Sequence, residues 1–493
     1  MFAEVLLRGM LEDLIKERLR KRDNLIKAGY DVYPAKVTRR DMIGDVLHRF
    51  FFLSLFRKQV SVGGRITGMR VQGGVMFLDI KDGNGKIQAV LNKKKIKDFA
   101  VWKDNLDIGD FAVIEGGVFK TKKGEKSVDV SKFAIAAKSL RPLPDAWSGF
   151  QNEEERLRKR YLDILFNPEV RDMVEKRAKF WNSMRCFLMD NGFLEVETPV
   201  LESLPGGADA KPFVTHHNAL DMDVYLRISM GELWQKKLMV AGLEKTFEIG
   251  RQFRNEGMDA EHLQDYTKME FYWSYADYEM GMRFVEEMYK QIAMETFGKL
   301  DFKIGKFNVD FGKKWERYDY QETIKNYTGI DVLNSDIKEI EAKLRELKVE
   351  YDKKGFNITR AIDNLWKYCR KQIEGPGFLV GLPVEISPLA KKDGKNPKLT
   401  QRFQVIIAGS EIGNGYSELN DPVDQAERFD EQMKLREAGD EEAQMKDRDF
   451  IEALEYGMPP TCGFGVSERL FSFLMNKPAK ECQIFPLMKP KNK

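Results

Sequence analysis

A polar loop between two strand-like runs carries residues suited to binding charged ligands. The stretch Phe247–Tyr278 begins with alternating apolar residues, passes through a polar segment and returns as an aromatic-rich run. Its candidate ligand-binding residues are Arg254, Glu256, His262, Glu270 and Tyr272. An arginine can clamp a phosphate or a carboxylate in a planar, bidentate way, and a carboxylate can accept from an amine. We expect these groups to line one cavity, although for Arg254, Glu256 and His262 taken in isolation a surface loop with ion pairs is the favoured interpretation.

Two glycine-containing segments near the C-terminus add further candidates. The segment Gly463–Arg469 (GFGVSER) places glycines, which permit close approach of a ligand, before the start of a helix. The segment Glu411–Glu418 (EIGNGYSE) has two acids that a straight strand would direct to opposite faces. Gly413 and Gly415 predict a bulge that turns both acids inward. Such carboxylates could hold Mg²⁺ near phosphates or pair with a ligand ammonium, and a polar hairpin is the structural alternative.

Other metal-binding residue types lack suitable spacing. The adjacent His216 and His217 would point to opposite faces of a strand, so we expect no metal there. The cysteines are far apart, which predicts buried thiols in a reducing cytosol and no zinc site. They are Cys186, Cys369, Cys462 and Cys482.

Patterning divides the 493 residues into an N-terminal helical extension (1–57), a small β-barrel (58–140), a proline-containing linker (141–160) and a catalytic domain (161–493). Short alternating runs separated by turns, such as the hairpin signal Asp82–Gly85, indicate a barrel of the OB type. Irregularly interleaved strands and helices indicate an α+β catalytic domain, with helices around a mainly antiparallel sheet.

Several elements can be placed within these regions. We expect helices at Arg171–Asn191 and Ile337–Lys354, and a strand at Phe193–Leu201 that Pro199 keeps from the centre of a sheet. The basic run Lys16–Arg22 is either a solvated helix face or a phosphate contact.

Composition excludes some classes of protein. With 42% hydrophobic residues and a net charge of +3, the chain is expected to be a soluble globular protein that binds nucleic acid only through local patches. No apolar run approaches the roughly 18 residues of a membrane span. We expect the apolar run Phe50–Phe56 to pack on the domain that follows it, and an exposed patch that contacts a partner is the less favoured alternative.

These segments together resemble the bacterial lysyl-tRNA synthetases of class II. The resemblance extends from about residue 17 to the C-terminus and rests on a few highly specific segments. They are FLEVETPVLESLPGGADAKPFVTHHNALDMDVYLRIS (193–229), FEIGRQFRNEG (247–257), VEISPLA (384–390), EIGNGYSELNDP (411–422), GFGVSERL with FPLMKP at the end, and GDFAVIEGGVFKTKKGE and SLRPLPD in the barrel region. The resemblance implies an OB-fold anticodon-binding domain before a class II catalytic domain. It also implies ATP-dependent formation of lysyl-adenylate and transfer of lysine to tRNA(Lys).

The resemblance also implies a residue-by-residue site. The catalytic residues would be Arg254 and Arg469. ATP would be bound by Arg254, Glu256, His262, Tyr266 and Arg469. L-lysine would be bound by Gly207, Glu232, Arg254, Glu270, Tyr272, Asn414 and Glu418. Mg²⁺ would be held by Glu411, with Gln404 where the family has a second acid. The anticodon would contact Arg70, Phe77, Gln88 and Glu125. A cytoplasmic homodimer without membrane contact is implied as well, with the helix at Arg171–Asn191 and the strand through Pro199 as its interface.

The chemistry of lysine agrees with this site. Lysine carries two cations and one anion, so its pocket needs an excess of buried acids together with an arginine or an amide. We expect Glu418 to be the specificity determinant, because an uncharged analogue would leave its carboxylate unpaired.

The sequence departs from the family pattern at several places. One acid is replaced by Gln404, residues 228–233 carry one additional residue, the segment before Arg469 is one residue short, and Leu263–Asp265 replaces a more usual Asn-Pro-Glu.

Three other functions fit the sequence less well. A regulatory paralogue would be expected to lose Arg254, Arg469 or the barrel, and all three are present. An enzyme for another amino acid, such as aspartate or asparagine, is disfavoured because an acidic substrate would need a cationic pocket, whereas Glu418, Glu270 and Tyr272 make this pocket acidic. An enzyme that modifies a protein lysine would lack the barrel.

Overall fold

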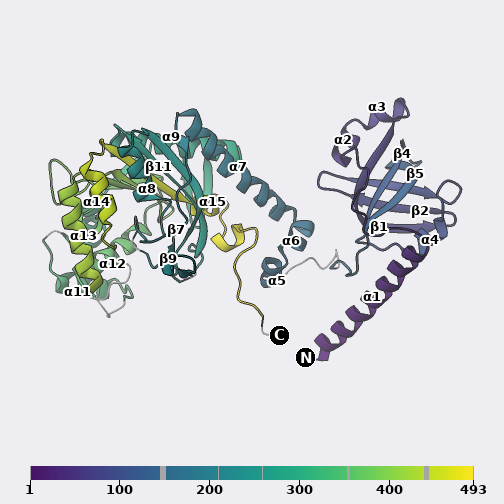
Figure 1. Cartoon of the computed structure of the whole chain (residues 1–493), viewed down its shortest axis with the longest axis horizontal. Coiled ribbons are helices and arrows are strands. Elements are labelled where there is room, and N and C mark those ends of the chain that lie inside the picture. The colour runs from purple at the N-terminus through teal and green to yellow at the C-terminus, as the bar shows by residue number, and fades with distance from the viewer. Residues whose placement is uncertain are drawn as a thin grey trace. The chain divides into compact units, whose positions relative to one another are not determined.

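The computed structural model describes residues 2–144, 152–208, 210–257, 259–332, 334–351, 356–437 and 444–491. The chain forms two compact units, Met1–Gln151 and Asn152–Lys493, which Figure 1 colours in chain order. The division falls inside the predicted linker 141–160, part of which lies outside the described residues.

The N-terminal unit contains a closed barrel with the strand order β1-β2-β3-β5-β4. The strands are β1 (Gln59–Gln72), β2 (Val75–Lys81), β3 (Lys86–Asn92), β4 (Phe111–Lys120) and β5 (Lys126–Ala137). Alternate residues of β2, namely Met76, Leu78 and Ile80, are fully buried inside the barrel, as the two-residue period of a strand requires. The barrel confirms the predicted OB-fold.

Helices flank this barrel. They are α1 (Phe2–Lys27), α2 (Ile43–His48), α3 (Phe50–Leu55) and α4 (Phe99–Asn105). The basic run of α1 is partly packed against the barrel, because Arg18 donates to the carbonyl of Ile108 at 3.0 Å and Lys21 pairs with Asp107 at 2.7 Å. The expectation that Phe50–Phe56 packs on the next domain is wrong for most of its side chains. A six-residue helix turns only one side to the barrel, so Phe50 is buried. The exposed members are Phe51, Phe52, Leu55 and Phe56.

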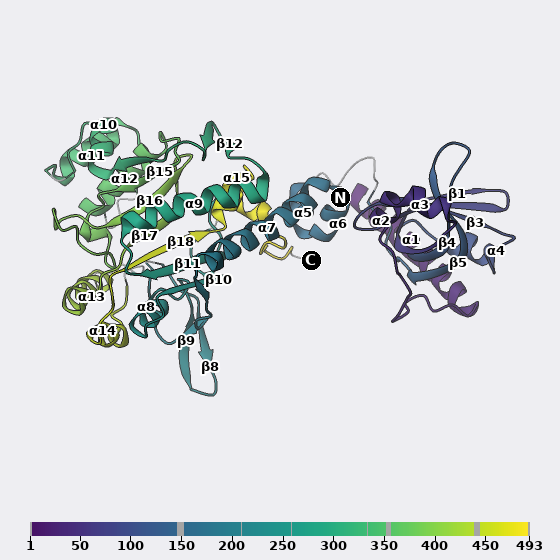
Figure 2. The same ribbon diagram turned by 90° about the horizontal axis from the view of Figure 1, so that it is seen from above.

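The C-terminal unit is built on an eight-stranded sheet with the order β14-β15-β16-β17-β18-β11-β10-β6. The strands are β6 (Leu194–Glu195), β10 (Lys245–Phe253), β11 (Asp265–Ser274), β14 (Glu316–Asp319), β15 (Gly377–Val380), β16 (Arg402–Ile407), β17 (Ser410–Ser417) and β18 (Thr461–Ser467). Pairing is antiparallel except at the two edges, where β14 and β15, and β10 and β6, run parallel. Figure 2 shows the central strands β16, β17, β18 and β11 side by side. The mainly antiparallel α+β architecture confirms the predicted fold class.

Two smaller sheets and the helices complete this unit. The sheets are β7-β9-β8 (Leu201–Glu202, Met222–Leu226 and Val214–His217) and β12-β13 (Asp301–Ile304 and Phe307–Asp310). The helices are α5 (Glu153–Arg158), α6 (Arg160–Phe166), α7 (Pro168–Asp190), α8 (Glu232–Val240), α9 (Tyr278–Phe297), α10 (Tyr320–Thr328), α11 (Ile337–Glu346), α12 (Ile358–Arg370), α13 (Pro422–Glu437), α14 (Arg448–Glu455) and α15 (Arg469–Leu474), with short 3₁₀ turns at Val384–Ile386 and Ala479–Cys482.

One face of the large sheet forms an aromatic core with α7 and α9. Phe271 on β11 and Phe464 on β18 belong to this core together with Phe284 on α9 and Phe180 on α7. Since neighbouring residues of a strand point to opposite sides, the other face of the same strands is left free to carry polar groups.

Two predicted elements differ from the structure. The helix expected at Ile337–Lys354 ends at Glu346, and Lys348 just beyond it has a positive φ of 55°. The strand expected at Phe193–Leu201 is reduced to the short strands β6 and β7 on either side of Pro199, which cannot donate a ladder hydrogen bond. The helix expected at Arg171–Asn191 is present as most of α7.

Among the described residues, no helix is both long and apolar enough to cross a membrane.

The aromatic core gives a stability prediction. Phe403 is fully buried, and its ring stacks on that of Phe464 with centroids 5.8 Å apart. Truncation in Phe403→Ala should lower the free energy of unfolding by about 3–5 kcal/mol, because it removes buried surface and leaves a cavity. Tyr456→Ala, at a side chain that is 79% exposed, should change it by less than about 0.5 kcal/mol. Denaturant unfolding of the two variants checks this, and equal effects would contradict the assignment of Phe403 to the core.

Candidate active site

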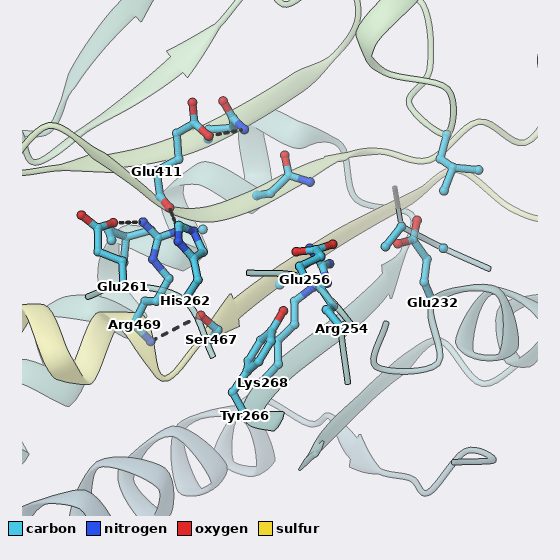
Figure 3. Close-up of a pocket in the computed structure, with 18 of the residues that line it drawn as sticks. Glu232, Arg254, Glu256, Glu261, His262, Tyr266, Lys268, Glu411, Ser467 and Arg469 are labelled. Carbon is cyan, nitrogen blue, oxygen red and sulfur yellow. Dashed lines mark hydrogen bonds and ion pairs between the residues drawn. The ribbon is translucent and has the colours of Figure 1, made fainter. Parts of the chain in front are cut away.

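A cavity of about 380 Å³ opens on the polar face of the large sheet. Its walls include most of the residues predicted to bind ATP, lysine or a metal. These are Gly207, Glu232, Arg254, Glu256, His262, Tyr266, Gln404, Glu411, Asn414 and Arg469. Figure 3 shows Arg469, His262 and Glu261 at one end of the cavity and Glu232 at the other, with Arg254 between them. The tertiary structure therefore brings together groups that lie more than 200 residues apart in the sequence.

The hairpin β10–β11 supplies the floor of the cavity. Its strands pair in register, with Glu248 opposite Glu270 and Thr246 opposite Tyr272. Since Phe271 points into the core, its neighbours Glu270 and Tyr272 face the polar side. The loop after β10 then carries Arg254, whose Nε donates to the carbonyl of Ile228 at 3.4 Å.

A bulge in β17 orients the acids at its two ends. Val405 on β16 pairs with Gly413, whereas the next residue, Ile406, pairs with Glu411, so Ile412 is the additional residue. This confirms the predicted bulge. Glu411 lines the cavity, and Glu418 lies on the same face as Tyr272, because a Cβ on Gly463 would meet both side chains.

The phosphate-binding candidates are paired with acids of the chain. Arg469 forms an ion pair with Glu261, and its Nη1 donates to the carbonyl of Glu411 at 3.2 Å. The exposed His262 ring lies 2.7 Å from a carboxylate oxygen of Asp259. The residue types of the sequence did not predict Glu261 as the ion-pair partner of Arg469.

The adenine-binding candidates lie near the middle of the cavity. Figure 3 shows Tyr266 beside Lys268, close to Arg254 and Glu256. The Tyr266 hydroxyl is held by the amide of Gln252, which fixes the ring on β11. Glu256 is exposed at the mouth of the loop, where its carboxylate could accept from an amino group.

The metal-binding candidates form a sparse donor set. One oxygen of Glu411 accepts from the indole of Trp366 at 2.6 Å, and the other accepts from the Gln404 amide at 3.4 Å. Within the described part of the chain, no group of three or more His, Cys, Asp or Glu side chains could hold a metal by itself. One carboxylate and one amide suit a Mg²⁺ ion that takes its remaining ligands from substrate phosphates.

Three of the predicted lysine-binding residues, Glu270, Tyr272 and Glu418, do not line this cavity and lie buried beside it. The Tyr272 hydroxyl donates to Glu270 at 3.1 Å. Burial, together with the charges of Glu232, Glu270 and Glu418, raises the pKa of Tyr272 well above its ordinary value. The phenol therefore remains a neutral donor.

Two lysines that the residue-type argument missed belong to the same cluster. Lys236 lies 2.8 Å from Glu232 and 2.6 Å from Glu418, and Lys268 lies 2.6 Å from Glu270. Burial raises the pKa of Glu418 to about 8, with Lys236 acting against that shift and the neighbouring acids adding to it. Neither Glu418 oxygen has a hydrogen-bond partner among the described residues. Oε2 is nevertheless in the ion pair with Lys236, so Oε1 is the oxygen without a partner of either kind. The four-residue spacing of Glu232 and Lys236 was the only sequence signal for this cluster.

Asn414 is oriented by a further residue that the sequence argument missed. Arg402 Nε donates to Asn414 Oδ1 at 2.8 Å. Since that contact occupies the amide oxygen, the amide nitrogen of Asn414 is the group left to donate to a ligand in the cavity. Gly207, with a φ of 81°, lines the same region, and a Cβ there would overlap Glu232.

In the barrel, the predicted base-contacting residues lie mainly on the outer surface. Phe77 is half-buried and alternates with the buried Met76 and Leu78, so it is not a core residue. Arg70 is its cross-strand partner, with the guanidinium carbon 5.7 Å from the ring centroid. Gln88 on β3 is buried and accepts from Ser127 at 3.1 Å, and Glu125 is exposed at the β4–β5 turn.

Comparisons with known proteins agree with this architecture. A family described as tRNA synthetases class II (D, K and N) matches residues 152–489, and one described as an OB-fold nucleic acid binding domain matches residues 60–136. The chain is 42% identical over 489 residues to a lysine–tRNA ligase of Roseiflexus sp. (strain RS-1), covering 98% of this chain and 100% of the relative. It is 40% identical over 490 residues to a lysine–tRNA ligase of Thermotoga maritima, covering 98% and 97% of the two chains.

The tight packing around Glu418 gives a second prediction. A Cβ at position 463 would overlap Glu418 Oε1 and lie 2.7 Å from the Tyr272 ring, so one of these buried side chains would have to move. Gly463→Ala should therefore lower the free energy of unfolding by about 1–3 kcal/mol. Gly394→Ala, where a Cβ meets nothing within 4 Å, is the matched control. Denaturant unfolding measures both variants, and an equal change in their free energies of unfolding would contradict the close contact of Gly463 with Glu418 and Tyr272.

Proposed function

Since this chain belongs to the lysine–tRNA ligases of class II, we propose that its cavity binds ATP and L-lysine, forms lysyl-adenylate and transfers the lysyl group to the 3′ end of tRNA(Lys). The observation that carries the choice of amino acid is the excess of buried acid beside the cavity. Glu232, Glu270 and Glu418 are each at most 6% exposed, and one oxygen of Glu418 has no partner among the described residues. A buried carboxylate oxygen without a partner is destabilising, and an ammonium ligand would supply the missing charge.

ATP is assigned to the end of the cavity that contains Arg469. In this proposal Arg254 binds the α-phosphate and Glu256 accepts from the adenine amino group, while Tyr266 stacks on the base. His262 and Arg469 bind the outer phosphates. For Arg469 this requires exchange of the Glu261 carboxylate for a phosphate oxygen, which replaces one charge-assisted hydrogen bond by another.

L-lysine is assigned to the opposite end of the cavity. Glu232 and the Gly207 carbonyl hold the α-amino group, and Arg254 and Asn414 hold the carboxylate. Its ε-ammonium reaches the Glu418 oxygen that has no partner, next to Tyr272. Glu270, which already accepts from Tyr272, adds negative charge behind them.

The first step then needs positioning and charge stabilisation and no general acid or base. An oxygen of the lysine carboxylate attacks the α-phosphorus, the bond to the bridging oxygen breaks, and diphosphate leaves. Arg254 neutralises charge that builds up on the α-phosphate oxygens, in a site held in place by the sheet. Mg²⁺, held by Glu411 and Gln404, would supply further neutralisation of the phosphates when bound.

The second step joins lysine to RNA. A hydroxyl of the terminal adenosine of the tRNA attacks the carbonyl carbon of the adenylate, and AMP leaves. The barrel contributes recognition of the anticodon by stacking on Phe77 and by polar contacts from Arg70, Gln88 and Glu125, since a partly exposed aromatic ring beside hydrogen-bonding groups is suited to unpaired bases.

A cytoplasmic homodimer is part of the proposal. Apolar side chains are exposed at the predicted interface, at the end of α7 and along the segment that contains Pro199. They are Met189, Leu194, Val200 and Leu201, each between 41% and 55% exposed. A second copy covering them would remove apolar surface from water.

ATP–diphosphate exchange with each of the standard amino acids tests the proposed activity. Exchange should depend on L-lysine, because a neutral or acidic side chain does not supply the charge that the buried acids lack. Absence of exchange with lysine, or faster exchange with another amino acid, would refute this function.

Substitution of the specificity determinant gives a third prediction. Glu418→Gln should raise the KM for lysine by at least about tenfold, since a hydrogen bond to a charged group contributes about 1.5–3 kcal/mol. The KM for ATP should change by less than about twofold, because Glu418 lies outside the ATP end. Glu455→Gln, at an exposed position on α14, is the control. Equal losses for lysine and ATP would count against the role of Glu418.

The pKa of Glu418 gives a fourth prediction. Its carboxyl is surrounded by Lys236 and Glu232 on α8, Glu270 and Tyr272 on β11, and by Tyr416, and burial raises its pKa to about 8. Below that pH the free protein holds a proton that the ε-ammonium must displace. Lysine affinity should therefore rise with pH by at most about tenfold per unit up to about pH 8, then level off.

Calorimetric titration with lysine between pH 6.5 and 8.5 measures this dependence. The same titration of Glu418→Gln corrects for protons that leave lysine itself. If lysine affinity varied with pH in the same way in the wild type and in Glu418→Gln, the role of the Glu418 proton would be contradicted.

A further inference from the structure

Building on the proposed function, we propose that Lys236 is a positioning and specificity residue whose ammonium holds Glu232 and Glu418 together and leaves the amino-acid site with room for one additional positive charge. No part of this role involves contact with ATP or tRNA. It explains how a site with three buried acids stays folded before lysine arrives.

The geometry places one internal ammonium between two acids from distant parts of the chain. Lys236 is 2.8 Å from Glu232, four residues earlier on α8, and 2.6 Å from Glu418, just after β17. The lysine side chain is 1% exposed, so solvent does not screen these contacts. Glu232 is also held by the Tyr416 hydroxyl, which leaves it little freedom to turn.

Aromatic rings fix the ammonium from other sides. The Lys236 ammonium lies 5.5 Å from the Tyr416 ring centroid and 5.8 Å from that of Phe450 on α14. A cation over an aromatic face is stabilised by the quadrupole of the ring. Although burial by itself lowers the pKa of Lys236, the two neighbouring carboxylates raise it overall, so the amine stays charged.

The charges of the cluster do not cancel. Glu232, Glu270 and Glu418 could carry three negative charges, and Lys236 and Lys268 supply two positive ones through the ion pairs described above. One carboxylate is left without a positive charge to balance it. We assign this excess charge to Glu418, because one of its oxygens has no partner among the described residues. A substrate side chain with one ammonium completes the balance, whereas a neutral or acidic side chain does not.

Without Lys236 the same acids would repel each other. Glu232 and Glu418 would then share a buried space with no counter-charge between them, and one of them would take up another proton. The ε-ammonium of the substrate would have to displace that proton and would meet acids that have moved apart. The loss should fall on lysine binding, because the ATP end of the cavity contains none of these groups.

Two variants of neighbouring lysines test the proposal. In Lys236→Met the unbranched side chain keeps most of the volume and loses the charge. Lys237→Met is the matched control, because that ammonium lies over the Trp234 ring, 4.7 Å from its centroid, and has no part in the acid cluster. The KM values for lysine and ATP come from ATP–diphosphate exchange, and the protons released on lysine binding come from calorimetry in two buffers of different ionisation enthalpy.

We expect Lys236→Met to raise the KM for lysine by tenfold or more (about 1.4 kcal/mol per tenfold), with the KM for ATP within about twofold and Lys237→Met close to wild type. Near neutral pH the wild type should release about one proton per lysine bound, and Lys236→Met should release about two. An unchanged KM for lysine in Lys236→Met, or equal losses for lysine and ATP, would overturn the proposal.

The wild-type proton count decides the matter even if Lys236→Met fails to fold. Release of about one proton per lysine bound supports Lys236 as the counter-charge of the acids. Release of about two protons, the number expected for the acids without Lys236, overturns the proposal. Failure of the proposed function is distinct, because the wild-type chain would then show no exchange with lysine at all.

Discussion

The burial of carboxylates on one face of the large sheet is the constraint on which the rest of the active site depends. Glu270 and Glu418 are at most 3% exposed, and a buried charge is tolerated only when it is paired or protonated. The same sheet has to be covered on its other face by the aromatic core, which fixes the strand register and hence the direction of every acid. The excess of buried negative charge beside the cavity is therefore a property of the fold as much as of the residues.

Internal pairs hold the ligand-binding groups in the free protein. Arg469 is engaged by Glu261, Glu270 by Lys268, and Glu418 by Lys236. In the proposed reaction, ATP replaces the partner of Arg469, whereas lysine adds to a cluster in which one oxygen is unpaired. In both cases a buried charge keeps a partner of opposite charge, which avoids the cost of leaving it unpaired.

In the N-terminal unit, the position of an apolar side chain within its strand or helix decides whether it is buried. Its two-residue alternation buries Met76 and Leu78 and leaves Phe77 outside, beside Arg70, which suits contact with unpaired bases. The exposed aromatic side chains of α3, Phe51 and Phe52, by contrast, make ring contacts only with each other among the residues described, in an edge-on arrangement with ring centroids 5.6 Å apart. They show that a run of apolar residues in a short helix does not by itself ensure burial, because one side of such a helix still faces away from the barrel.

The sequence by itself determined the barrel, the α+β catalytic domain and the bulge between Glu411 and Glu418, which follow from local periodicity and glycine placement along the chain. Its resemblance to a family predicted residues for binding ATP and lysine, most of which the structure places around one cavity. It did not determine that Lys236 joins Glu232 to Glu418, or that Glu261 occupies Arg469. Only the tertiary structure decided which charges neutralise each other, because ion pairing between residues far apart in sequence depends on strand register and burial.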